Sequence, residues 1–92
     1  MGGRSQRVGP PAPNVVETEV DGDVCLYDPS SERVAVLNGT ASDVWRLADG
    51  TYTIAEITDL LASSYGTQPT SIAPDVEAVV TEFVEAGFLA QE

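Results

Sequence analysis

Signals that start and stop helices fill the chain from residue 37 to residue 89 and constrain its fold more than any other feature. The first stretch reads LNGTASDVWRLADG, in which Asn38 or Thr40 can cap a short helix over about Ala41–Ala48 before Asp49-Gly50 ends it. The apolar face of this helix carries Ala41, Val44, Trp45 and Ala48. We therefore expect Trp45 to be part of the core.

Two longer helices are predicted after Gly50. Thr53-x-x-Glu56 is a capping box, and the helix that it opens runs to about Tyr65, before a stop at Gly66. The buried side of this helix is expected to hold Ile54, Ile57, Leu60, Leu61 and Tyr65. Pro74 suits the first position of the last helix, which Gly87 ends. The apolar stripe of the last helix is formed by Val76, Val79, Val80, Phe83 and Val84.

Three short strands are predicted before the first helix. Residues 15–20 alternate, with three residues on a half-buried side and Glu17 and Glu19 on the exposed side. Asp21-Gly22 signals a hairpin, and the turn Asp28–Ser31 leads to a third strand over Glu32–Leu37. The prediction is an α+β domain in which a three-stranded antiparallel β-meander precedes three α-helices that gather on one side of the sheet.

The register of the first hairpin has two solutions. A two-residue turn places Cys25 and Tyr27 beside Val16 and Val20, whereas a three-residue bulged turn places Val24 and Leu26 there. We favour the bulged turn because it buries more apolar surface.

The N-terminal end differs in composition from the rest. Residues 1–14 hold three glycines, three prolines and two arginines but almost nothing to bury, so we expect a disordered tail before a single domain over residues 15–92.

Charge and composition exclude several functions. The formal net charge is −11 and the chain has no lysine, so nucleic acid and membrane surfaces are poor partners and a basic or neutral peptide suits it better. Histidine is absent and Cys25 is the single cysteine, which removes the common catalytic triads and metal sites. We therefore expect no catalysis, no metal and no cofactor. With one cysteine and no apolar run of about 20 residues, the protein is expected to be cytoplasmic.

The third strand is expected to be an open edge of the sheet. After Arg33, the run Val34–Leu37 has no charge, proline or bulge of the kind that protects natural edges. An extended peptide could therefore add to it by main-chain hydrogen bonds. A homodimer or the N-terminal tail covering this edge is the alternative.

The order and spacing of the Leu37–Gly50 stretch, the capping box and the ending VEAGFL resemble the PqqD family of leader-peptide recognition elements. The resemblance covers about residues 15–89 and implies a winged-helix-like fold. In that family the leader of a precursor peptide binds as an extra strand on the third strand, in a cleft shared with the last helix. The residues that this implies are Arg33, Val34, Ala35, Val36 and Leu37 on the strand and Val76, Val79, Val80 and Phe83 on the helix, with Asp75 and Glu82 attracting basic leader side chains.

The resemblance also implies a partner enzyme, such as a radical SAM protein, a leader peptidase or a cyclase. Leu37-Asn38-Gly39-Thr40 departs from the Leu-Asn-Pro-Thr form of many lasso-peptide members, which weakens a lasso assignment without excluding it, so the pathway is expected to be a lasso-peptide, radical SAM or related one. A different function for the same architecture is a winged-helix regulator or adaptor that docks on protein or DNA through its last helix. That helix carries no Arg or Lys, so DNA is disfavoured. A subunit that only stabilises its enzyme partner is the third reading.

Overall fold

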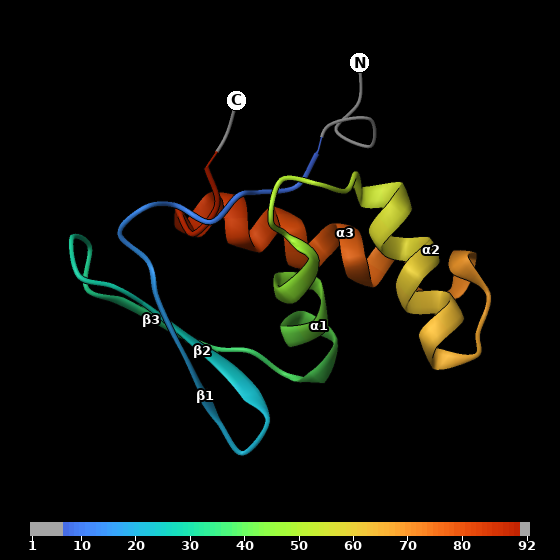
Figure 1. Ribbon diagram of the computed structural model, residues 1–92, viewed down its shortest axis with the longest axis horizontal. Coiled ribbons are helices and arrows are strands. Elements are labelled where there is room, and N and C mark those ends of the chain that lie inside the picture. Colours follow the sequence, from blue (N-terminus) through green and yellow to red (C-terminus); the bar gives the residue numbers. More distant parts are fainter. Residues whose placement is uncertain (1–6, 91–92) are drawn as a thin grey trace.

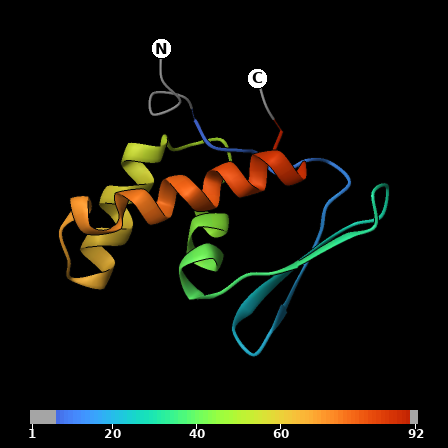
Figure 2. The same cartoon turned by 180° about the vertical axis from the view of Figure 1, so that it is seen from behind.

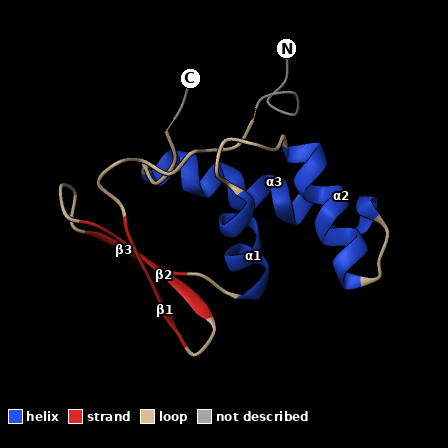
Figure 3. Ribbon diagram, in the orientation of Figure 1, coloured by secondary structure: helices blue, strands red, loops and turns tan. Residues whose placement is uncertain are grey.

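A computed structural model describes residues 7–90 and shows three strands followed by three helices (Figure 1). The strands are β1 (Val16–Val20), β2 (Asp23–Asp28) and β3 (Arg33–Val36), and the helices are α1 (Gly39–Leu47), α2 (Ile54–Tyr65) and α3 (Pro69–Ala86). The sheet is antiparallel with the order β1-β2-β3 and lies beside the helical part (Figure 3). The predicted α+β fold is confirmed. Within residues 7–90, no helix is both long and apolar enough to span a membrane.

The helix ends follow local signals in the sequence. The Asn38 side chain accepts the N–H of Ala41 at 2.8 Å, and Thr53 and Glu56 form both hydrogen bonds of the predicted capping box. Gly66 and Gly87 end α2 and α3 in the left-handed conformation, with φ angles of 70° and 81°. Caps of this kind can be predicted from the sequence because each depends only on neighbouring residues.

The prediction for the start of the last helix is wrong. Helix α3 begins at Pro69, and Pro74 lies inside it. A proline costs no hydrogen bond in the first turn, so Pro69 takes the role that Pro74 was expected to have. Pro74 has no N–H to donate to the carbonyl of Thr70, and the helix continues through that position.

The buried side of α2 is narrower than predicted. Ile57 and Leu61 are buried, but Leu60 and Tyr65 are 44% and 41% exposed. The Tyr65 hydroxyl donates to the Asp43 carboxylate of α1 at 2.6 Å, so its ring lies over the surface instead of in the core. Partial burial and this carboxylate both raise the pKa of Tyr65.

The first hairpin adopts the register that we did not favour. Val16 pairs with Tyr27 and Val20 pairs with Asp23, which leaves a two-residue turn at Asp21-Gly22. Both turn residues have positive φ, 54° and 85°, and such a turn twists in the sense that the two strands need. The bulged turn is therefore a wrong prediction.

Glu17 and Glu19 are exposed, as predicted, but their side chains also contact polar groups of α1. The Trp45 indole N–H donates to Glu17 at 2.9 Å, and Arg46 forms an ion pair with Glu19 at 2.9 Å. The ion pair and its hydrogen bond raise the pKa of Arg46. The two carboxylates thus serve as partners for polar groups of α1. The alternation of apolar residues along the strand contains no information about these partners.

The core lies between the inner face of the sheet and the three helices. Trp45 is buried as predicted, and its ring meets that of Phe83 edge to face with centroids 5.3 Å apart. Seen from behind, α3 runs across both α1 and α2 (Figure 2). Its inner residues therefore contribute to the core from the far side.

Residues 7–14 differ from the predicted disordered tail, whereas residues 1–6 lie outside the described part of the chain. Val8 is buried, and its N–H donates to the Tyr52 carbonyl at 2.8 Å. Farther along, Ala12 donates to the Phe88 carbonyl at 2.8 Å and Ala90 donates to the Pro10 carbonyl at 2.9 Å. Figure 1 shows this strap, residues 7–12, passing over the end of α3.

Gly9 is the position where the strap approaches the body most closely. A Cβ there would lie 2.1 Å from the Ala48 carbonyl oxygen, and the φ of Gly9 is 92°. Only glycine satisfies both conditions. The strap therefore requires glycine at position 9, which its composition alone did not indicate.

Candidate functional site

The third strand presents unpaired backbone groups along its outer edge. The Leu37 N–H donates to the Val24 carbonyl at 2.8 Å, which makes Leu37 and Val24 a hydrogen-bonded pair. Such pairs alternate along an antiparallel ladder, so Ala35 also bonds to β2, whereas the N–H and C=O groups of Val34 and Val36 point away from it. Val34 and Val36 are therefore positioned to pair with an added strand.

A buried serine holds this strand to the helices. The Ser42 hydroxyl accepts the Val24 N–H at 3.0 Å and donates to the Leu37 carbonyl at 3.1 Å. It therefore occupies the last rung of the β2–β3 ladder and ties it to α1. The edge strand is fixed at this end by a side chain that sequence reasoning did not single out.

A cleft of about 300 Å³ lies beside the open edge. Its walls come from β3 and the segment after it on one side and from the C-terminal end of α3 on the other. The lining residues are Arg33, Val34, Ala35, Leu37, Glu82, Phe83, Ala86 and Phe88. A volume of this size suits one or two side chains of a bound peptide.

Some of the predicted site residues meet in this cleft and others do not. Arg33, Val34, Ala35 and Leu37 line it together with Glu82 and Phe83. Val36 does not line it, although its backbone lies on the same edge. The remaining helix residues lie elsewhere: Val76 and Val80 are buried in the core, Val79 is half-buried and Asp75 is exposed.

Two cleft residues were missed. Ala86 and Phe88 flank the glycine that ends α3, and the stop signal at Gly87 marks where the chain folds back toward β3. The N–H of the strap residue Ala12 donates a hydrogen bond to the Phe88 carbonyl. Phe88 therefore both lines the cleft and binds the strap.

The turn before β3 is held by a carboxylate. Asp28 accepts the Ser30 hydroxyl at 2.7 Å and the Ser30 N–H at 3.0 Å. These donors stabilise the ionised form and lower the pKa of Asp28. The turn therefore fixes the start of β3, where Arg33 lines the cleft.

The outer face of the sheet is apolar and uncovered within residues 7–90. Val34 and Val36 are 67% and 70% exposed, whereas Val24 and Leu26 on the inner face are fully buried. Residues directly opposite each other share a face, so the outer face is formed by Val16, Thr18, Val20, Asp23, Cys25, Tyr27, Val34 and Val36. This exposed and largely apolar face is a candidate interaction surface.

The arrangement contains binding groups and no recognisable catalytic constellation. Among residues 7–90, no three Cys, Asp or Glu side chains are grouped so that they could hold a metal ion. What the site offers is an open strand edge, an apolar cleft, and one positive and one negative side chain at its rim. These features define a small winged-helix-like domain suited to binding an extended peptide.

The family model for coenzyme PQQ synthesis protein D (PqqD) matches residues 23–89, and the chain belongs to this family. A solved structure described as lasso peptide synthetase B1 complexed with the leader peptide is 29% identical, with a TM-score of 0.75, and the match covers 89% of this chain and 96% of that one. TbiB1 in complex with the TbiA(beta) leader peptide has a TM-score of 0.78 over 89% of this chain and 95% of its own, and at 18% identity it shares the fold. No curated protein matches this sequence.

Proposed function

We propose that this protein is a non-catalytic recognition element that binds the leader of a ribosomally synthesised precursor peptide by strand addition along β3. It then presents the precursor to a modifying enzyme or leader peptidase. The observation that carries the proposal is the open edge at Val34 and Val36 beside the cleft. Two similar solved structures are complexes with leader peptides, which supports this choice of ligand.

Some of the contacts proposed for the leader would supply affinity, and others would supply specificity. Backbone bonds to Val34 and Val36 would hold any extended chain, whereas apolar side chains entering beside Ala35, Phe83 and Phe88 would select among chains. Glu82 would favour a basic leader residue and Arg33 an acidic one, each pair contributing about 0.2–1 kcal/mol because both side chains are exposed. Apolar contacts in the cleft would therefore decide which leader binds.

Delivery explains how such a domain contributes without catalysis. A leader bound here keeps the rest of the precursor close to a partner enzyme, which raises its effective concentration at the active site. Because such precursors come directly from the ribosome, we place the protein in the cytoplasm. The 29% identity to a lasso peptide synthetase B1 favours a lasso-peptide pathway, in spite of Gly39 at the position where proline was expected.

The partner enzyme is expected to dock on the outer face of the sheet. Three strands about 4.8 Å apart and about five residues long form a face of about 15 Å by 17 Å. This area is well below the roughly 800 Å² per partner of a stable homodimer, so it suits a transient contact better. An added leader strand would widen the same face.

Titration with the precursor peptide that is encoded beside the gene for this protein tests the function directly. Trp45 is the only tryptophan and contacts Phe83, a cleft residue, so its fluorescence should report binding. We expect saturable binding of micromolar or tighter affinity for the precursor and for its isolated leader. The core peptide without the leader is the matched control and should not bind. Equal binding of leader and core would refute the proposal.

Replacement of Val16 by lysine on the outer face distinguishes the surface that binds the enzyme from the surface that binds the leader. Val16 is exposed on β1, the strand farthest from the cleft, so the leader should bind Val16→Lys within about twofold of the unchanged protein. Processing of the precursor by the partner enzyme should fall by about tenfold, the effect of about 1.4 kcal/mol of lost docking energy. Unchanged processing would show that the enzyme docks elsewhere.

A further inference from the structure

The strap of residues 7–12 is attached to the rest of the protein at two places. Near its start, the Val8 N–H donates to the Tyr52 carbonyl and the Val8 carbonyl accepts the Gly50 N–H, both at 2.8 Å. The Val8 side chain is buried in the core. These three residues do not line the leader cleft. The first attachment is therefore an anchor in the loop between α1 and α2, outside the proposed binding site.

The second attachment of the strap is to the chain that follows α3. The Ala12 N–H donates to the Phe88 carbonyl at 2.8 Å, and the Ala90 N–H donates to the Pro10 carbonyl at 2.9 Å. Between these hydrogen bonds, the two segments form an antiparallel bridge. The strap and the chain after α3 thus pair as a short antiparallel ladder, and one residue of this ladder, Phe88, lines the cleft.

Phe88 connects the ladder to the cleft. Its side chain forms part of the cleft wall and is buried. The Phe88 N–H donates to the Phe83 carbonyl at 2.9 Å, whereas the Phe88 carbonyl accepts from Ala12 of the strap. The end of α3 therefore holds one peptide group of Phe88, and the strap holds the other. With both groups held, the direction of the ring is restricted to a few staggered rotamers.

The two attachments of the strap are closely coupled. Only Gly9 separates Val8 of the anchor from Pro10 of the ladder. Gly9 also packs so tightly on the body that a Cβ there would lie 2.1 Å from the Ala48 carbonyl oxygen. A displacement at the anchor is therefore passed on to the ladder and to Phe88.

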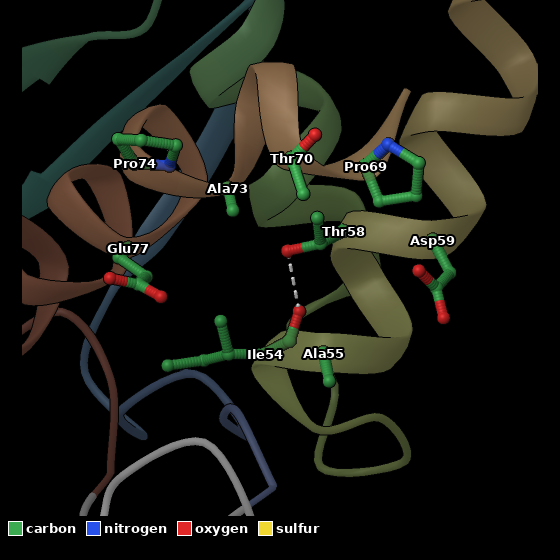
Figure 4. Close-up of a pocket in the computed structure, with 9 residues that line it drawn as sticks. All are labelled: Ile54, Ala55, Thr58, Asp59, Pro69, Thr70, Ala73, Pro74 and Glu77. Atoms are coloured by element: carbon green, nitrogen blue, oxygen red, sulfur yellow. Dashed lines mark hydrogen bonds between the residues drawn. The ribbon is translucent and has the colours of Figure 1, made fainter. Parts of the chain in front are cut away.

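A second cavity provides a contrast to the cleft. It has a volume of about 410 Å³ and lies between the N-terminal halves of α2 and α3 (Figure 4). Its walls include Thr58 and Ala73, and it shares no lining residue with the cleft. The ladder lies at the opposite, C-terminal end of α3. Loss of the ladder should therefore change the cleft and leave the second cavity as it is.

We propose that the strap is a positioning element for leader recognition. Its hydrogen bond to Phe88 holds that ring as a wall of the cleft, and this wall determines how tightly apolar leader side chains bind. Ala12 and Val8 act through Phe88 and do not contact the leader. The inference rests on the proposed function, because it concerns the same cleft. Strand addition along β3 and selection in the cleft then depend on different parts of the chain.

Ala12→Pro tests the hydrogen bond to Phe88 in the full chain. Proline removes the N–H that donates to the Phe88 carbonyl. It suits the position because Ala12 already precedes Pro13, and residues before a proline favour an extended backbone. We expect the isolated leader of the precursor peptide to bind about fivefold more weakly in calorimetric titration, since one hydrogen bond is lost.

Val8→Ala tests the anchor, and Val44→Ala is its matched control. Both changes remove the same methyl groups from a buried valine, but Val44 belongs to α1 and does not line the cleft. We expect Val8→Ala to weaken leader binding about threefold and Val44→Ala to change it less than about twofold. The melting temperature of Val44→Ala should fall at least as far as that of Val8→Ala. Equal losses of binding in the two variants would overturn the proposal.

Phe88→Leu distinguishes positioning of the ring from a general loss of stability. It keeps this wall of the cleft apolar but removes the ring that the strap holds. If Ala12 acts through the ring, Ala12→Pro should change leader binding less than about twofold in the Phe88→Leu protein. An undiminished effect of Ala12→Pro in that protein would also overturn the proposal.

Amide spectra of the ¹⁵N-labelled protein test the same coupling without any peptide. Ala12→Pro should shift the signals of Ala86 and Phe88 at the cleft and leave those of Thr58 and Ala73 at the second cavity unchanged. Equal shifts at both cavities, or none at the cleft, would overturn the proposal. Unweakened leader binding by Ala12→Pro would overturn this inference alone. Absence of leader binding by the unchanged protein would overturn the proposed function, and this inference with it.

Discussion

The two edges of this small sheet differ in what they offer to another chain. On β1, the outward backbone groups belong to Glu17 and Glu19, whose side chains are engaged by Trp45 and Arg46 of α1. On β3, they belong to Val34 and Val36, which carry no charge and lie beside a cleft. If the proposed function holds, the comparison teaches that an open edge gains specificity from the cleft beside it. The β1 edge carries these charges, and the cleft beside β3 does not extend to it.

A pair of proline substitutions should give the largest contrast between the edges. Val36→Pro removes an outward N–H from β3 without breaking a bond to β2, and Glu19→Pro makes the same change on β1. We expect Val36→Pro to weaken leader binding at least tenfold, or about 1.4 kcal/mol, and Glu19→Pro to change it less than twofold. Calorimetric titration measures both, and thermal unfolding checks that each variant is folded. Equal losses at the two edges would remove the distinction between them.

Filling the cleft should have a smaller effect. Ala86 lines the cleft and is half-buried, so the larger side chain of Ala86→Leu takes space that leader side chains would use. We expect leader binding to weaken about three- to tenfold, about 0.7–1.4 kcal/mol, in the same titration. Ala78→Leu is the matched control because Ala78 is exposed on the same helix and lines neither cavity. A cleft variant that binds as well as the control would show that the cavity is not used.

The smallest effect concerns pH and the turn that starts β3. The pKa of Asp28 lies below its ordinary value of 3.8 because Ser30 donates to the ionised carboxylate. The stabilisation is therefore complete above about pH 4 and is lost as pH falls through the lowered pKa of the folded state. The melting temperature should fall more steeply with acid in the unchanged protein than in Asp28→Asn. Parallel curves would mean that this carboxylate does not hold the turn.

Features that depend on neighbouring residues were predictable from the sequence. The caps at Thr53, Gly66 and Gly87 were predicted, and Asn38 was one of two candidates for the first cap, because each cap is defined within one turn of helix. The open β3 strand was predicted from its lack of protective residues. The structure places it as predicted at one edge of the sheet.

The register and the far wall of the cleft were not predictable in the same way. Glu17 accepts a hydrogen bond from Trp45, 28 positions away, and no local pattern contains that pairing. The stripe on α3 is continuous, so it cannot reveal that Val76 and Val80 are buried in the core whereas Phe83 also lines the cleft. Val8 was assigned to the tail because one valine among glycines and prolines gives no periodic signal. Contacts distant in sequence decided all three.

Amide hydrogen exchange with and without the precursor peptide tests the central claim most directly. The N–H groups of Val34 and Val36 point out of the sheet in the free protein and should exchange rapidly. With saturating precursor, we predict that both become protected, whereas the outward N–H groups of Glu17 and Glu19 on β1 exchange as before. Unchanged exchange at Val34 and Val36, with protection arising at another surface, would contradict strand addition at β3.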